Sequence, residues 1–192
     1  MQNEMQRLFF ALWPEARARS ALQVLAASLR GRIEARWTRP ENLHMTLAFL
    51  GNVEPERRQA LSEAAGEVAD QGFRLTLDRL EYWRKADVLC LTSSTPCEPL
   101  RELADGLAAR LRAVGFTLEK RPFRAHLTLA RKARRVPLDL PELTPLCWSA
   151  SRFVLVESRL ERGGGSAYAI LQAWPLTAEK SAKRDGLGPS NV

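Results

Sequence analysis

Short apolar runs and longer helical stripes alternate along the chain, and turn residues separate them. Short runs rich in apolar, β-branched or aromatic residues are typical of strands. The runs that fit this description are 7–13, 36–38, 43–50, 73–83, 88–93, 123–131, 152–159 and 166–174. Gly51-Asn52 is expected to close the strand 43–50. A charged turn joins 73–83 to 88–93, so we expect these two strands to pair as a hairpin.

Three longer segments carry leucine or alanine at helical spacing, and each begins beside a proline that favours a first helical turn. The predicted helices are 15–33, 56–71 and 99–114. The last has the clearest apolar stripe, formed by Leu100, Leu103, Leu107 and Leu111, and Gly115 follows it as a stop. The proline-rich segment 136–145 and the triple glycine 163–165 are expected to be loops. Residues 177–192 have no apolar periodicity, which predicts a disordered tail.

The same ten-residue pattern occurs twice. RPENLHMTLA at 39–48 and RPFRAHLTLA at 121–130 align without a gap and share Arg-Pro, then His, Thr, Leu and Ala at the same offsets. Each copy lies shortly after a predicted helix, and the two copies are 82 residues apart. A repeat of this length predicts two lobes related by an approximate two-fold axis. We expect residues 1–176 to form a single bilobed domain.

Composition narrows the class of protein. A chain of 192 residues can bury a core without disulfides or metals, and its 45% hydrophobic and 27% charged residues are ordinary for a soluble globular protein. No apolar run approaches the length of a membrane span, and the short apolar patch 8–13 leads directly into charged residues. We therefore expect a cytoplasmic protein without a membrane partner. Its three scattered cysteines are expected to be reduced.

The net charge of +7 favours a polyanionic partner, since cationic side chains neutralise phosphates. The location of this charge is more informative than its size. The basic stretch 131–135, RKARR, directly follows the second histidine motif. A solvated basic loop is the alternative explanation for this stretch.

His44 and His126 are the only histidines, and each is followed two residues later by a threonine. Alternate side chains of a strand share a face, so His44 shares a face with Thr46, and His126 with Thr128. The apolar residues between them mark the opposite face as the core. A lone histidine is most simply structural, but two copies with identical neighbours on the non-core face indicate chemistry.

Two imidazoles facing one cleft can supply a general acid and a general base, because histidine titrates near pH 6.5. In-line displacement at a phosphodiester needs such a pair, since the attacking and leaving oxygens lie on opposite sides of phosphorus. Each threonine lies about 7 Å along the strand from its histidine and can donate to a phosphate oxygen. We therefore predict that His44 and His126 are catalytic and that Thr46 and Thr128 bind substrate.

Other uses of histidine fit the sequence less well. A zinc or two-metal site would lack ligands, because no Asp, Glu or Cys cluster accompanies either histidine. No motif of a serine or cysteine nucleophile is present near them either. We expect neither a metal nor another cofactor.

With these motifs the chain resembles the 2H phosphoesterase superfamily, and more closely the RNA 2',3'-cyclic phosphodiesterases, also called 2'-5' RNA ligases. The resemblance extends from RLFFAL at Arg7, through RWTRPENLHMTLAFLG and RPFRAHLTLAR, to LVESRL and the closing WPL. It implies an α+β fold with two pseudo-symmetric lobes of antiparallel sheet and flanking helices around a central cleft.

The resemblance also implies a reaction. A family member hydrolyses a 2',3'-cyclic phosphate at an RNA 3' end to a 2'-phosphomonoester without a metal, and 2'-5' ligation is its minor reverse. His44 then corresponds to the proton donor and His126 to the acceptor, although the residues alone leave these roles exchangeable. The family pattern adds a phosphate contact from Arg131. Strict alternation would turn Arg131 away from His126, so this role requires the strand to end or twist there, and a surface arginine in a basic loop is the alternative. We expect a monomer that acts on RNA ending in a cyclic phosphate, with tRNA fragments as one source.

Several alternatives stay open. Phe49 and Phe123 are candidates for stacking on a terminal base, although packing in the core is the simpler expectation for both. The substrate could instead be a small cyclic phosphate or a 2'-5' oligonucleotide, and the basic stretch 131–135 favours the RNA polymer. A non-catalytic RNA-binding module would keep the fold but would not need two intact histidine motifs.

Overall fold

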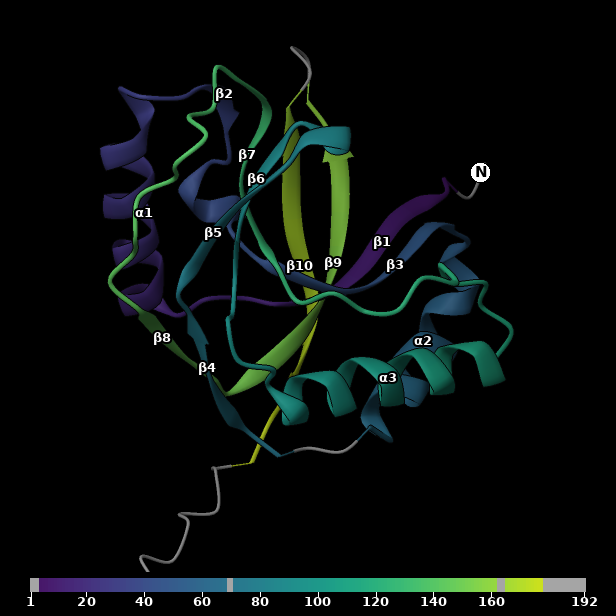
Figure 1. Cartoon of the computed structure of the whole chain (residues 1–192). Coiled ribbons are helices and arrows are strands. Elements are labelled where there is room, and N and C mark those ends of the chain that lie inside the picture. The colour runs from purple at the N-terminus through teal and green to yellow at the C-terminus, as the bar shows by residue number, and fades with distance from the viewer. Residues whose placement is uncertain (1–3, 69–70, 162–164, 178–192) are drawn as a thin grey trace, which may run out of the picture.

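The structure is a computed structural model that describes residues 4–68, 71–161 and 165–177 (Figure 1). Its helices are α1 (Ala16–Arg30), α2 (Arg58–Gly66) and α3 (Glu98–Ala113), with short 3-10 helices η1 (Pro40–Asn42), η2 (Pro55–Arg57) and η3 (Arg84–Ala86). Its strands are β1 (Gln6–Leu12), β2 (Glu34–Trp37), β3 (Met45–Val53), β4 (Phe73–Leu77), β5 (Arg79–Trp83), β6 (Val88–Thr92), β7 (Leu127–Arg134), β8 (Leu146–Ala150), β9 (Arg152–Leu160) and β10 (Ser166–Pro175).

The strands form two four-stranded sheets and one two-stranded sheet. The first sheet has the order β10-β9-β1-β3, the second has the order β2-β7-β6-β5, and β4 pairs with β8. All of these pairings are antiparallel. In Figure 1, α1 lies on one side of the molecule against β2 and β8, while α2 and α3 lie together on the other side. The predicted α+β class with antiparallel sheets and flanking helices is confirmed.

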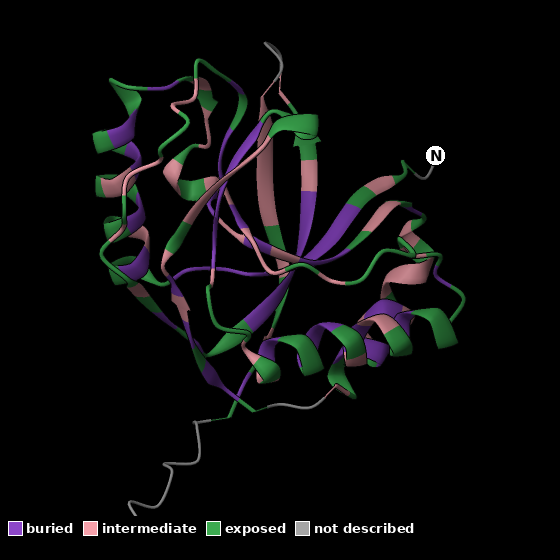
Figure 2. Cartoon of the chain, in the orientation of Figure 1, coloured by how far each residue is buried: buried purple, intermediate pink, exposed green. Residues whose placement is uncertain are grey.

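Apolar side chains divide between two faces of the first sheet. Leu8, Phe10 and Leu12 of β1 point into the main core, which also contains the fully buried leucine stripe of α3. Phe9 and Ala11 alternate with them and belong to a smaller cluster on the opposite face. Figure 2 shows buried residues along the inner sides of the three α-helices. One face of this sheet therefore builds the core, while the other is available for a site.

The predicted strand 73–83 is wrong in one respect, because it divides at Asp78 into β4 and β5, which belong to different sheets. The Asp78 carboxylate accepts a hydrogen bond from the Ser94 amide at 2.7 Å and another from its hydroxyl, which holds the break. β5 pairs with β6, so the hairpin prediction holds for that part. β4 pairs with β8, a strand that the sequence analysis did not predict. Trp148 of β8 is buried and anchors this small sheet in the core.

Other boundaries also differ from the predictions. β3 continues through Gly51-Asn52 to Val53, because Gly51 adopts a φ of 73° that lets the strand kink without ending. α2 ends at Gly66 instead of residue 71. β7 begins at Leu127, four residues later than expected, and continues to Arg134.

The chain ends and turns are described only in part. The carbonyl of Thr177, the first residue of the predicted tail, accepts a hydrogen bond from the Gly72 amide at 2.7 Å. Residues 178–192 and most of the triple-glycine turn lie outside the described residues. In the part of the chain that is described, no helix is long and apolar enough to cross a membrane. The three cysteines are unpaired, as expected.

Candidate active site

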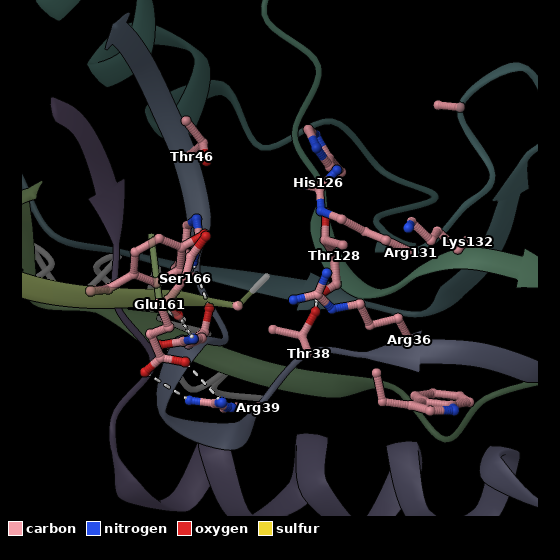
Figure 3. A pocket seen from close by; sticks show the side chains of 16 residues that line it. Arg36, Thr38, Arg39, Thr46, His126, Thr128, Arg131, Lys132, Glu161 and Ser166 are labelled. Atoms are coloured by element: carbon pink, nitrogen blue, oxygen red, sulfur yellow. Dashed lines mark hydrogen bonds and ion pairs between the residues drawn. The ribbon is translucent and has the colours of Figure 1, made fainter. Parts of the chain in front are cut away.

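The two motif histidines face one cavity of about 500 Å³. His44 and His126 each lie immediately before a strand, β3 and β7 respectively, and each of these strands belongs to a different sheet. The residues predicted from sequence that line this cavity are His44, Thr46, His126, Thr128 and Arg131. In Figure 3, Thr128 and Arg131 come from one strand, which His126 directly precedes, while Thr46 comes from another. The structure therefore brings all five predicted residues together.

β3 has an unpaired residue directly after its threonine. Thr46 pairs with Ala11 of β1, and Ala48 pairs with Phe10, so Leu47 has no partner across the strand pair. Such a bulge interrupts the alternation of side chains between the two faces. Leu47 and Ala48 are consequently both buried.

β7 repeats this irregularity at the matching position. Thr128 pairs with Cys90 of β6, and Ala130 pairs with Leu89, which leaves Leu129 unpaired. Alternation beyond the bulge is displaced by one residue, so Arg131 lies on the same side as Thr128. Strict alternation therefore does not hold at this point, and the extra residue supplies the departure from it that a place for Arg131 in the site requires.

Phe49 occupies the position in β3 that Arg131 occupies in β7. The expectation that Phe49 packs in the core is wrong, since 47% of its surface is exposed and the Arg7 guanidinium lies 5.1 Å from its ring centroid. Phe123 is partly buried and packs against the core, as expected. Neither phenylalanine lines the histidine cavity.

His44 lies among aromatic rings on the apolar face of the first sheet. Trp13 stacks on it with a centroid separation of 5.3 Å and an interplanar angle of 6°. Tyr168 meets it edge-on at 5.2 Å, and Phe9 lies at 4.9 Å. Burial is the main cause that lowers the pKa of His44 to about 4, and the positive charges of Arg131 and His126 contribute in the same direction.

His126 lies beside polar and charged side chains. The Trp83 ring lies 4.6 Å from it, and the Arg124 guanidinium lies 4.4 Å above Trp83. Glu81 holds this group together, because its carboxylate accepts hydrogen bonds from Arg124 at 2.5 Å and from the indole of Trp83 and hydroxyl of Thr92, both at 2.8 Å. Burial chiefly lowers the pKa of His126, while the carboxylate of Glu81 acts to raise it.

Both imidazoles are held by the same backbone contact. Nδ1 of His44 lies 2.6 Å from the carbonyl oxygen of Asn42, and Nδ1 of His126 lies 2.8 Å from that of Arg124. A carbonyl only accepts, so Nδ1 carries the hydrogen in each neutral ring. Nε2 is therefore the nitrogen left to accept a proton from a ligand, or to donate one after protonation.

Lys132, from the basic stretch singled out in the sequence, adds positive charge to the lining of this cavity. Sequence reasoning did not assign several other residues that surround it. Arg36 also lines the cavity, and Arg39 forms an ion pair with Glu161 at 2.9 Å. The Thr38 hydroxyl donates to the carbonyl of Thr128 at 3.1 Å and so joins β2 to the motif strand. The segment RWTRP before the first motif contained three of these residues, but only the tertiary fold shows which side chains face the cavity. In the described part of the chain no three His, Cys, Asp or Glu side chains cluster to hold a metal ion.

Two consecutive segments of the chain, 12–90 and 91–165, each match the family described as LigT like Phosphoesterase. Each segment contains one histidine motif. The chain belongs to the LigT-like phosphoesterase family. The resemblance to this family inferred from the sequence is therefore confirmed.

Relatives within the LigT-like phosphoesterase family cover almost the whole chain. A protein of Escherichia coli (strain K12) named RNA 2',3'-cyclic phosphodiesterase is 35% identical over 175 residues, which cover 91% of this chain and 99% of that protein. A protein of the same name from Thermus thermophilus is 29% identical over 182 residues, which cover 90% of this chain and 91% of that protein. The crystal structure of E. coli LigT complexed with 3'-AMP has a TM-score of 0.83 at 35% identity, covering 91% and 99% of the two chains.

Proposed function

We propose that this LigT-like phosphoesterase hydrolyses the 2',3'-cyclic phosphate at the 3' end of RNA to a 2'-phosphomonoester, without a metal ion. The observation that carries the proposal is the convergence of both His-x-Thr motifs and Arg131 on one cavity. Relatives that match nearly all of this chain are named for the same activity. The similar E. coli LigT structure is a complex with 3'-AMP, a nucleotide that carries a phosphate on its ribose.

In the proposed reaction, Nε2 of His126 takes a proton from water while the water oxygen attacks phosphorus. The bond from phosphorus to the 3'-oxygen breaks on the opposite side, and protonated His44 gives its proton to that oxygen. The product has a 2'-phosphate and a 3'-hydroxyl. Proton exchange with solvent then restores both rings. The Thr46 and Thr128 hydroxyls and the Arg131 guanidinium stabilise the charge that develops on the non-bridging oxygens.

The environment of His44 sets a condition on this cycle. With a pKa of about 4, His44 is neutral near pH 7 in the free protein. An anionic phosphate beside Nε2 favours the charged imidazolium, so substrate binding raises this pKa. We propose that His44 becomes an acid only after the substrate has entered.

A cavity of about 500 Å³ accommodates a single nucleotide, which also supports the second candidate, a small cyclic phosphate. The 2'-5' oligonucleotides and a non-catalytic RNA-binding role have no such supporting observation.

Reversal of the proposed cycle, with a 5'-hydroxyl in place of water, would give 2'-5' ligation. We also propose a cytoplasmic monomer in which residues 1–176 act as one bilobed unit, with tRNA fragments among its substrates.

The decisive experiment incubates an oligoribonucleotide ending in a 2',3'-cyclic phosphate with the protein and excess chelator, and identifies the product by chromatography. A 2'-phosphate product is expected. A 3'-phosphate product would mean that the 2'-oxygen leaves instead. Absence of any product, while the same RNA is hydrolysed by alkali, would refute the proposal.

A further inference from the structure

A group of exposed cations continues from the edge of the histidine cavity along the second sheet. Lys132 lines the cavity, while Arg134 and Arg135 follow it at the end of β7. Arg84 and Lys85 belong to η3, whose last residue, Ala86, also lines the cavity. We call Arg84, Lys85, Lys132, Arg134 and Arg135 the basic strip, and all five are exposed.

Backbone and side-chain contacts join the two segments that carry the basic strip. The amide of Ala133 donates to the carbonyl of Asp87 at 3.0 Å, which fixes β7 against the turn after η3. The hydroxyl oxygen of Tyr82 lies 2.9 Å from the Asp87 carboxylate and 3.1 Å from the carbonyl of Ala133. The cations are therefore presented by a connected framework. Arg135 lies 3.8 Å from the carboxylate of Glu34, and this long, exposed ion pair contributes little to stability.

The basic strip also contains unusual backbone conformations. Within the described residues, the non-glycine residues with positive φ are Asp87 at 51°, Lys132 at 53° and Arg135 at 52°. Two of them belong to the strip, and the third lies between its two segments. Residues with a long side chain seldom adopt this conformation, and such strain concentrates at functional sites.

The first half of the chain shows how such an irregularity is built without strain. β3 kinks after its motif at Gly51, which has a φ of 73°. β7 also has a second irregularity after its motif, between its pairings of Arg131 and Arg134 with β2. There Lys132 adopts the left-handed conformation that a bulge usually gives to glycine. In the second half of the chain, Lys132 and Arg135 therefore occupy positions whose positive φ would suit glycine better.

We propose that the basic strip binds the phosphates of the RNA segment that precedes the terminal cyclic phosphate. This inference rests on the proposed function, in which the cavity holds the terminal nucleotide. The RNA strand enters past Lys132 and Arg131, so its preceding phosphates meet the strip next. Single-stranded RNA fits the strip, because backbone contacts by Lys and Arg need no base sequence. The strip would thus give the enzyme a preference for an RNA end over a single nucleotide, although its cavity holds one nucleotide.

The experiment compares binding and hydrolysis for the double variant Arg134→Gln/Arg135→Gln. Fluorescence anisotropy measures binding of a labelled five-nucleotide RNA ending in a 3'-phosphate over a salt series. The slope of the logarithm of the association constant against the logarithm of salt concentration is negative. Loss of two phosphate contacts should make it shallower by about 1.4 and weaken binding roughly tenfold at low salt. KM for an RNA ending in a cyclic phosphate should rise by a similar factor, whereas hydrolysis of a nucleoside 2',3'-cyclic phosphate should be unchanged.

The matched control is Arg17→Gln/Arg112→Gln, which removes the same charge from exposed positions on α1 and α3. An equal loss of RNA affinity in this control, or an unchanged salt slope in the strip variant, would overturn the inference. A wild-type protein that hydrolyses neither substrate would refute the proposed function, and the binding measurement would still decide the role of the strip.

A second variant separates binding from a structural role. Arg135→Gly removes the charge and also the strain of a positive φ, so its melting temperature should exceed that of Arg135→Gln by about 2 °C while both bind RNA more weakly. A lower melting temperature for Arg135→Gly, together with wild-type RNA binding, would assign Arg135 a structural role and overturn its part in the strip.

Discussion

The two halves of this LigT-like phosphoesterase present the same motif on different backgrounds. In the first half, Thr46 pairs with Ala11, which pairs in turn with Val154 of the next strand. In the second half, Thr128 pairs with Cys90, which pairs with Glu81. One histidine therefore faces an apolar surface, while the other lies near a carboxylate.

This difference shows how a duplicated motif can supply two unlike groups. The motif fixes where each imidazole lies and which nitrogen faces the cavity. The neighbouring strands fix the solvation and the charge around it. Aromatic rings around His44 disfavour its charged form strongly, whereas Glu81 partly offsets the effect of burial on His126.

The largest effect is expected from removing either histidine. His44→Ala and His126→Ala should each lower kcat for a cyclic phosphate by about 10²- to 10⁴-fold, because each removes the acid or the base of the proposed reaction. An aryl phosphodiester, whose leaving phenolate needs no proton, distinguishes their roles. It should be hydrolysed well by His44→Ala but poorly by His126→Ala. The opposite pattern would exchange donor and acceptor.

The aromatic surroundings of His44 should also affect stability in acid. Its folded pKa of about 4 lies below the unfolded value of 6.5, so the unfolded state binds a proton first as pH falls. The free energy of unfolding should therefore fall by about 3 kcal/mol as the pH is lowered from 6.5 to 4. Denaturant titrations of wild type and His44→Asn at pH 7 and 4.5 measure this loss. Equal losses in both proteins would contradict the assigned environment.

Arg131 should matter more than its counterpart Phe49. Arg131→Gln should lower kcat/KM by about 10- to 100-fold, since a charge-assisted contact to phosphate is lost. It should also raise the pKa of both histidines, because the Arg131 cation lowers them. Steady-state kinetics and NMR titration of the rings measure the two effects. Unchanged histidine pKa values would place the Arg131 charge away from the rings.

Glu81 should affect one histidine and spare the other. Glu81→Gln removes a negative charge that raises the pKa of His126, so that pKa should fall while His44 is unchanged. We expect roughly a tenfold loss of kcat through misplacement of Arg124 and Trp83. An NMR titration following both rings decides the point. Equal shifts in the two rings would argue against separate environments.

The smallest effect is expected at Phe49. Phe49→Gln should leave the kinetics with a nucleoside cyclic phosphate unchanged, since Phe49 does not line the cavity. A fall in kcat/KM as large as that of Arg131→Gln would show that the two halves contact the phosphate symmetrically.

The sequence predicted the parts of the molecule that depend on local pattern. The leucine stripe of α3, the hairpin of β5 with β6 and the four residues of the two motifs follow from periodicity and repetition. The division at Asp78 and the pairing of β4 with β8 depend on contacts with distant strands. No periodicity along the chain contains that information.

The site shows the same limit. Alternation placed His44, Thr46, His126 and Thr128 correctly, but it failed beyond each threonine, because a bulge exists only relative to the neighbouring strand. The environment of His44 likewise depends on Tyr168, which lies 124 residues further along the chain. A single sequence therefore identifies motif side chains that line the cavity but does not determine their protonation.

The unpaired Leu129 gives β7 a change of phase. In a regular strand the Arg131 side chain would point into the protein interior, and its guanidinium would have to be buried there. One additional residue instead places the Arg131 side chain on the side of the strand that lines the cavity. Deleting Leu129 should consequently be far more harmful than shortening any surface loop, because every side chain beyond it would exchange inside for outside.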